Sequence, residues 1–192
     1  MNYQDYIWDL GGTLLDNYET STAAFVHTLQ DFGLTASHDE VYKALKVSTD
    51  YAVRQFAPGN KEFLKSYKAN EAKELEHPIL FEGASELLAQ IIQQGGRNFL
   101  ISHRDDQVLE ILQKTQIGPY FTEVVTATNG FKRKPDPESM LYLKDKYQIE
   151  SGLVIGDRPI DIEAGQAAGF SCYLFDNMKN LEEFVDIELE KE

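Results

Sequence analysis

The chain has 192 residues, of which 42% are hydrophobic, and its 18 basic and 32 acidic side chains give a formal net charge of -14. This length exceeds one minimal domain and allows a sizeable buried core. The negative charge disfavours nucleic-acid backbones and anionic membranes as partners, because both would repel it. No apolar run approaches the roughly 20 residues that span a bilayer, and the start MNYQDYIWD lacks a signal peptide's basic end and apolar centre. We therefore expect a cytoplasmic protein.

The first predicted strand, YIWD, ends at Asp9 and is followed by a glycine-containing turn and a long helical stretch. Apolar residues recur at helical spacing from Ala23 to Phe32, and Ser37 precedes Glu40 as a capping box before VYKAL. The stretches YAVRQF and KEFLKSYKANEAKEL also have helical patterns. We therefore predict a small all-helical insert over residues 17–77, between two parts of a core formed by residues 1–16 and 78–192.

After the insert, helical and strand-like segments alternate. In chain order they are SELLAQIIQQGG, NFLIS, DQVLEILQKTQI, VVTAT, PESMLYLKDKY, LVIGD, the AGQAAG helix, CYLF and a final helical stretch, NLEEFVDIELEKE. This alternation is typical of an α/β protein with a doubly wound, Rossmann-like parallel sheet. Right-handed crossovers place helices on both faces of such a sheet.

Three apolar runs end on polar residues, at Asp9, Ser102 and Asp157. Ligands bind parallel sheets at the carboxyl ends of the strands, where the strand order reverses, so we expect these side chains to meet at one crevice. Asp161 follows one helical turn after Asp157, and the loop FKRKPDPE supplies Lys134. Carboxylates suit magnesium, whereas Lys and Ser suit phosphate oxygens. The sequence thus predicts a phosphate and magnesium site.

These residues resemble the motifs of the haloacid dehalogenase superfamily of phosphohydrolases, and the match spans nearly the whole chain. The family's D-x-D-G-T motif corresponds to residues 9–13, its strand-terminal Ser or Thr to Ser102, its Lys before Pro to Lys134, and its G-D-x-x-x-D motif to residues 156–161. A helical insert directly after the first motif resembles the branch of phosphoglycolate phosphatase and β-phosphoglucomutase. In that branch a cap closes over the crevice, excludes water and selects the substrate.

The resemblance implies a magnesium-dependent phosphatase that acts on small phosphorylated metabolites, as a monomer or homodimer. Asp9 would attack phosphorus and form an aspartyl-phosphate that water hydrolyses. Magnesium would be held by Asp9, the backbone carbonyl of Gly11, Asp157 and Asp161, the last either as a ligand or as an orienting group.

The implied substrate-binding residues lie around the same crevice. Ser102 and Lys134 would bind the phosphoryl oxygens, and both also count as catalytic residues. Gly12 and Thr13 would let the backbone turn tightly under the phosphate, and His103 directly follows Ser102. Simpler interpretations exist, because Ser102 could cap a helix and the acidic pair could complement a helix dipole.

Position 11 departs from the family pattern, because Gly11 stands where these phosphatases carry a second Asp that protonates the leaving group. Losing such a general acid and base typically costs about 10² to 10⁴ in rate, or roughly 3 to 5 kcal/mol of barrier. Three interpretations follow: a slow phosphatase, one that acts on substrates with good leaving groups, or one that recruits another acid. His103 is the only nearby candidate acid.

Other functions stay open. A catalytically weakened member of the superfamily could bind phosphate or a phosphometabolite as a sensor or partner protein. Metal-independent dehalogenation by Asp9 is disfavoured by the presence of Asp157 and Asp161, and a mutase would need the missing acid. In the insert, Arg54 is a candidate for contacting a substrate carboxylate, although a surface charge is the simpler interpretation.

Overall fold

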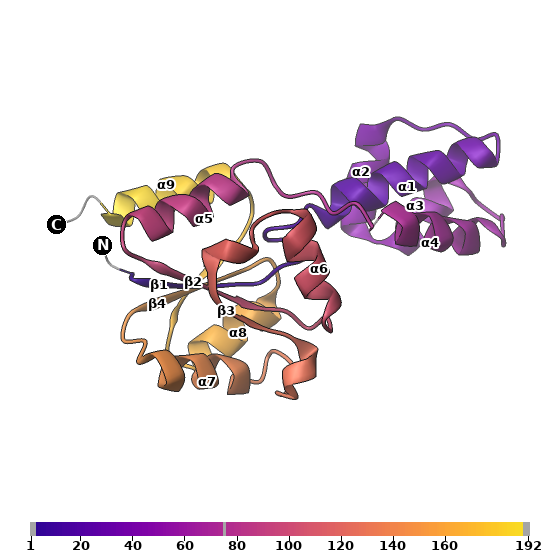
Figure 1. Ribbon diagram of the computed structural model, residues 1–192. Coiled ribbons are helices and arrows are strands. Elements are labelled where there is room, and N and C mark those ends of the chain that lie inside the picture. The colour runs from indigo at the N-terminus through magenta and orange to yellow at the C-terminus, as the bar shows by residue number, and fades with distance from the viewer. Residues whose placement is uncertain (1–2, 75, 190–192) are drawn as a thin grey trace. The chain divides into compact units, whose positions relative to one another are not determined.

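The computed structural model describes residues 3–74 and 76–189, and the chain forms two compact units (Figure 1). The core unit comprises Met1–Leu15 and Leu80–Glu192, and the helical unit comprises Asp16–Ile79. The predicted insert, residues 17–77, therefore starts one residue later and ends two residues earlier than the helical unit.

The core unit is built on a five-stranded parallel sheet with the strand order β3-β2-β1-β4-β5. The strands are β1 (Asp5–Trp8), β2 (Arg97–Ile101), β3 (Phe121–Val125), β4 (Gly152–Gly156) and β5 (Ser171–Leu174). The order reverses at β1, whose last residue, Trp8, pairs with Leu100 of β2 and Ile155 of β4. The residues that follow these three strands are therefore neighbours at one edge of the sheet.

Helices cover both faces of this sheet. They are α5 (Ala84–Gln93), α6 (Gln107–Lys114), α7 (Glu138–Tyr147), α8 (Pro159–Ala167) and α9 (Met178–Leu189), with short 3-10 helices η1 (Gly118–Tyr120) and η2 (Ala127–Asn129). Side chains of β1 alternate between the faces: Tyr6 and Trp8 pack with α5, α6 and α9, whereas Ile7 packs with α7 and α8. Figure 1 shows α5 and α9 on one side of the strands and α7 and α8 on the other. The predicted doubly wound α/β fold is confirmed.

The helical unit contains four helices in its described residues. They are α1 (Asn17–Asp31), α2 (His38–Val47), α3 (Thr49–Phe56) and α4 (Phe63–Glu74). Its apolar core is centred on Phe25, whose ring meets those of Phe63 and Tyr67 at centroid distances of 4.9 and 5.0 Å. The predicted capping box is confirmed, because Ser37 accepts from the Glu40 N–H and Glu40 accepts from the Ser37 N–H.

Two predicted helices extend beyond the described residues. The stretch KEFLKSYKANEAKEL includes residue 75, and NLEEFVDIELEKE includes residues 190–192, all of which lie outside the described part of the chain. Among the helices that the structure does describe, none combines the length and the apolar character needed to cross a membrane.

Candidate active site

Asp9 stands directly after β1, at the carboxyl edge of the sheet. Its backbone N–H donates to the carbonyl of Ile155 on β4 at 2.9 Å, which extends the strand pairing by one residue. The side chain is buried, and burial raises the pKa of the Asp9 carboxyl, while the nearby Lys134 ammonium opposes this rise. The local strand pairing therefore holds the Asp9 carboxylate at the carboxyl end of the central strand, where the strand order reverses.

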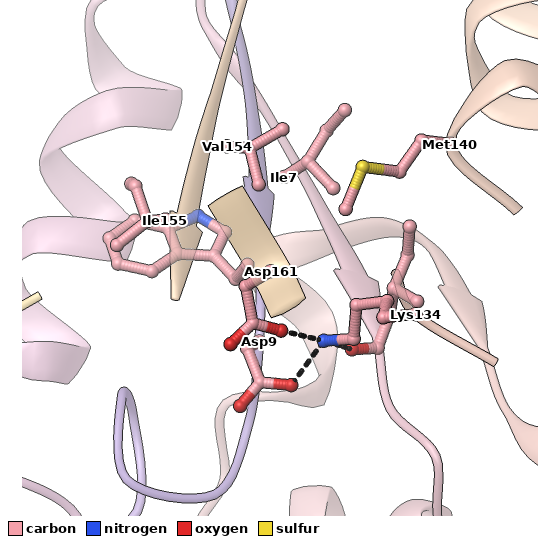
Figure 2. Close-up of a pocket in the computed structure, with 9 residues that line it drawn as sticks. Ile7, Asp9, Lys134, Met140, Val154, Ile155 and Asp161 are labelled. Carbon is pink, nitrogen blue, oxygen red and sulfur yellow. Dashed lines mark hydrogen bonds and ion pairs between the residues drawn. The ribbon is translucent and has the colours of Figure 1, made fainter. Parts of the chain in front are cut away.

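Lys134 carries its ammonium into the centre of the site. Its Nζ lies 2.5 Å from Oδ1 of Asp9 and 2.5 Å from Oδ1 of Asp161. Figure 2 shows the ammonium beside both carboxylates, with a dashed line to each, and the apolar side chains of Ile7 and Met140 farther up in the same pocket. A buried cation between two buried anions offsets much of their mutual repulsion and of the cost of their burial.

A third carboxylate, Asp157, completes an acidic cluster. One oxygen each from Asp9, Asp157 and Asp161 lie within 4.8 Å of one another. Oδ1 of Asp157 is buried and has no hydrogen-bond partner among the described residues. Burial, with the charges of Asp9 and Asp161, raises the pKa of Asp157 to about 6.

This cluster fits a hard divalent cation. Magnesium takes oxygen ligands and few protein groups, and the cluster offers carboxylate oxygens, one of them a buried oxygen without a donor. Asp161 is itself oriented by the start of α8, because its Oδ2 accepts the N–H of Arg158 at 3.1 Å. Asp9, Asp157 and Asp161 could therefore hold such an ion.

The turn after β1 packs closely against the cluster. Gly12 has a φ of +85°, and a Cβ there would overlap the carboxylate of Asp157. Only glycine accommodates this left-handed backbone and close approach together. Thr13 is fully buried, and its hydroxyl has no partner among the described residues. Gly11 is half-buried and pairs by backbone with Leu15, so it adds no side chain to the site.

Ser102 lies directly after β2, and its position is set by backbone pairing. Its N–H donates to the Val125 carbonyl of β3 at 2.9 Å, and its Oγ accepts the N–H of Arg104 at 3.3 Å. It does not cap α6, which begins after Asp106. Among the described residues the Ser102 hydroxyl donates to no group, which leaves this donor free for a ligand oxygen.

His103 contacts the backbone of Lys134. Its Nε2 accepts the Lys134 N–H at 2.8 Å, so the ring proton is placed on Nδ1. Burial, with the positive charges of Lys134, Arg133 and Arg158, lowers the pKa of His103 to about 4. At neutral pH the imidazole is therefore uncharged, and its Nε2 holds the lysine loop instead of donating a proton. This geometry weakens the hypothesis that His103 replaces the missing acid.

The core unit thus contains every predicted catalytic, phosphate-binding and metal-binding residue, whereas the candidate Arg54 lies on α3 of the helical unit. Direct contacts join Lys134 to Asp9, Asp161 and His103, and Gly12 packs against Asp157. The contact between His103 and Lys134 is not predictable from local pattern, because 31 residues separate the two.

The fold and site define an α/β protein with a buried lysine and acidic cluster at the point where the strand order reverses. The model of the haloacid dehalogenase-like hydrolase family matches residues 6–175 of the chain. The chain therefore belongs to the haloacid dehalogenase-like hydrolases, as its motifs predicted.

Individual relatives agree with this assignment. A crystal structure of a hydrolase from Streptococcus pneumoniae TIGR4 is 70% identical in sequence, with a TM-score of 0.93, over 97% of this chain and 100% of that one. A phosphoglycolate phosphatase of Aliivibrio fischeri is 29% identical over 88% of this chain and 81% of its own length. An N-acetylmuramic acid 6-phosphate phosphatase of Pseudomonas putida is 28% identical over 88% of this chain and 81% of its own length.

Proposed function

We propose that this protein is a magnesium-dependent phosphatase of small phosphorylated metabolites, with Asp9 as its nucleophile. The observation that carries the proposal is the position of the Asp9 carboxylate, which contacts Lys134 and lies in one cluster with Asp157 and Asp161. The phosphoglycolate and N-acetylmuramic acid 6-phosphate phosphatases similar to this chain support the substrate class. We also propose that the helical unit, Asp16–Ile79, acts as the cap that selects the substrate.

In this proposal, magnesium is held by the carboxylates of Asp9, Asp157 and Asp161 and by the backbone carbonyl of Gly11. The bound ion would supply positive charge that offsets the phosphate and the carboxylates around it. Lys134 supplies a second positive charge from the chain itself, and the free hydroxyl donor of Ser102 binds a phosphoryl oxygen.

Two displacements at phosphorus complete the proposed reaction. An oxygen of Asp9 forms a bond to phosphorus while the bond from phosphorus to the ester oxygen breaks, and the leaving oxygen takes a proton from water. A water molecule then attacks the phosphorus of the aspartyl-phosphate. The bond between phosphorus and the Asp9 oxygen breaks as the water oxygen bonds to phosphorus. The water's protons pass to the phosphate or to solvent, and inorganic phosphate and the free carboxylate are released.

The glycine at position 11 limits which substrates react quickly. No side chain there protonates the leaving group, and Nε2 of His103 is already engaged by the Lys134 N–H. We therefore expect phosphate esters with poor leaving groups to react about 10² to 10⁴ times more slowly than with a positioned acid, and acyl phosphates to be favoured.

Phosphate release with and without magnesium tests this function, with 2-phosphoglycolate, acetyl phosphate and p-nitrophenyl phosphate as substrates. We expect magnesium-dependent release that Asp9→Asn abolishes. The control Asp145→Asn makes the same chemical change on the exposed surface of α7 and should retain activity. Gly11→Asp should raise the rate with 2-phosphoglycolate more than with acetyl phosphate.

The rival function is a phosphate-binding sensor whose site is disabled at Gly11. Absence of release by the wild type, with release by Gly11→Asp, would refute the phosphatase and favour that rival. Release that does not depend on magnesium would contradict the assignment of the acidic cluster.

A further inference from the structure

We propose that a cavity beside Ser102 is a subsite for a second anionic group on the substrate. This inference rests on the proposed function and concerns the core unit alone. The cavity has a volume of about 240 Å³ and lies between the ends of β2 and β3, the loop before Lys134 and the start of α7. Its polar lining comes from Ser102, His103, Thr126, Lys132, Arg133 and Ser139.

The basic side chains that line the cavity favour the binding of an anion. The chain carries 32 acidic and 18 basic side chains, yet the cavity is lined by Lys132 and Arg133 and by no carboxylate. Arg133 forms no ion pair within the described part of the chain. The Lys132 ammonium pairs with the partly buried Asp136 at 3.6 Å, and the Lys132 N–H donates to Glu138. The cavity is therefore a locally positive region of a strongly negative protein, which raises the local concentration of anions.

Two hydrogen-bond donors of the lining lack acceptors in the part of the chain that the structure describes, whereas the Thr126 hydroxyl donates to Oδ1 of Asp106 at 3.3 Å. Because Nε2 of His103 accepts the Lys134 N–H, the remaining ring N–H of His103 is on Nδ1, and it has no partner among the described residues. The hydroxyl of Ser139 also donates to no group in the described part of the chain, although its side chain is buried, while the Ser102 hydroxyl serves the phosphoryl group of the proposed function. A carboxylate or phosphate only accepts hydrogen bonds, so it complements such a set of donors.

The size and position of the cavity define the ligand further. The cavity volume of about 240 Å³ is well above the roughly 10 to 15 Å³ that one water molecule needs on a comparable measure. It has room for a carboxylate or phosphate group. Since Ser102 lines the cavity and also binds the transferred phosphoryl group in the proposed function, the second anion lies only a few bonds from that phosphoryl group. The ligand class is a short phosphate monoester with a second carboxylate or phosphate.

Equilibrium binding tests the subsite without turnover, because it can be measured calorimetrically on the full chain carrying Asp9→Asn. The two probes are 2-phosphoglycolate and ethyl phosphate, which share a phosphoryl group on two carbons and differ in the carboxylate. We expect 2-phosphoglycolate to bind at least about tenfold more tightly, as one charge-assisted contact allows.

Two added substitutions should remove this preference by different routes. Arg133→Gln removes the unpaired charge, and Ala127→Leu fills the cavity, which Ala127 also lines, without changing any charge. Each should reduce the preference to about twofold or less. Lys179→Gln, on the exposed surface of α9, removes one positive charge from the core unit outside the cavity lining and should leave the preference unchanged.

Three results would overturn the proposal. The first is no preference for 2-phosphoglycolate, and the second is a preference that survives both Arg133→Gln and Ala127→Leu. The third is a preference that Arg54→Gln, in the helical unit, removes and Arg133→Gln does not. Inorganic phosphate gives a further outcome. If a second equivalent of it binds, if Arg133→Gln abolishes that binding, and if the two probes bind equally, the cavity holds a free anion and the proposal is wrong. Failure of the phosphatase itself would appear separately, as absence of phosphate release by the wild type.

Discussion

The Nζ atom of Lys134 lies 2.5 Å from Oδ1 of Asp161, and each of the two side chains is only 1% exposed. The same ammonium contacts Asp9, so one lysine compensates two buried carboxylates, one directly after β1 and one in α8. Removing one partner of a buried ion pair leaves a charge that is neither paired nor solvated. The stability of the core unit therefore depends on the same contacts as its proposed chemistry.

Lys134→Met should lower the free energy of unfolding by about 3 to 5 kcal/mol, because it leaves Asp9 and Asp161 uncompensated. Urea denaturation without added metal measures this change. The neighbouring Lys132→Met removes an ammonium whose side chain is 73% exposed, and it should change the free energy by no more than about 0.5 kcal/mol. Equal effects of the two substitutions would contradict the buried ion-pair arrangement.

Thr13→Val should stabilise the protein and slow phosphate release. The Thr13 hydroxyl is buried without a partner in the described chain, so the similarly shaped Val removes an unsatisfied polar group, with a gain of about 1 kcal/mol. The matched control is Thr22→Val in α1, where the hydroxyl is equally buried and unpartnered among the described residues. Both variants should unfold at a higher urea concentration than the wild type, but only Thr13→Val should release phosphate more slowly. If Thr13→Val releases phosphate at the wild-type rate, the Thr13 hydroxyl has no role in the active site.

A comparison of Gly12→Ala with Gly130→Ala should separate the cost of backbone strain from the cost of crowding the acidic cluster. Both Gly12 (φ +85°) and Gly130 (φ +79°) have left-handed backbones, but a Cβ at Gly130 meets nothing within 4 Å, whereas one at Gly12 overlaps Asp157. Gly130→Ala should cost about 1 kcal/mol, and Gly12→Ala about 1 to 3 kcal/mol more. Magnesium should raise the Tm of the wild type and Gly130→Ala but not of Gly12→Ala, because Asp157 is displaced. An equal rise in Tm for all three proteins would argue against Asp157 as a ligand.

Acidification should destabilise the wild type through His103. Its pKa is about 4 in the folded protein, against 6.5 for an ordinary histidine, because burial and Lys134, Arg133 and Arg158 outweigh the opposing charge of Asp161. Between pH 6.5 and 4 the unfolded chain binds more protons, so this contribution to stability is present above pH 6.5 and is lost as the pH falls toward 4.

The comparison with His103→Gln isolates that contribution. The free energy of unfolding should fall more steeply in the wild type than in His103→Gln between pH 6.5 and 4, since other groups titrate in both proteins. Urea denaturation at several pH values measures the two slopes, and NMR titration of the imidazole measures the pKa directly. Parallel slopes, or a pKa near 6.5, would contradict the engaged and buried state of His103.

Local pattern was sufficient for much of this protein. Short apolar runs indicated β1, β2 and β4, and the polar residues after them, Asp9, Ser102 and Asp157, were expected at one edge because parallel strands share a direction. The capping box at Ser37 and Glu40 was equally predictable, because its hydrogen bonds join residues three positions apart.

Tertiary structure alone decided which partners these residues have. Lys134 meets Asp9 across 125 positions of sequence, and His103 accepts the Lys134 N–H across 31. The cavity lined by Arg133 likewise depends on how the loop before α7 passes the ends of β2 and β3. Sequence periodicity reports burial and local hydrogen bonding, because these act over one strand or helical turn. The path of a loop, and therefore the pairing of its charges, is set by packing against segments that are distant in the chain.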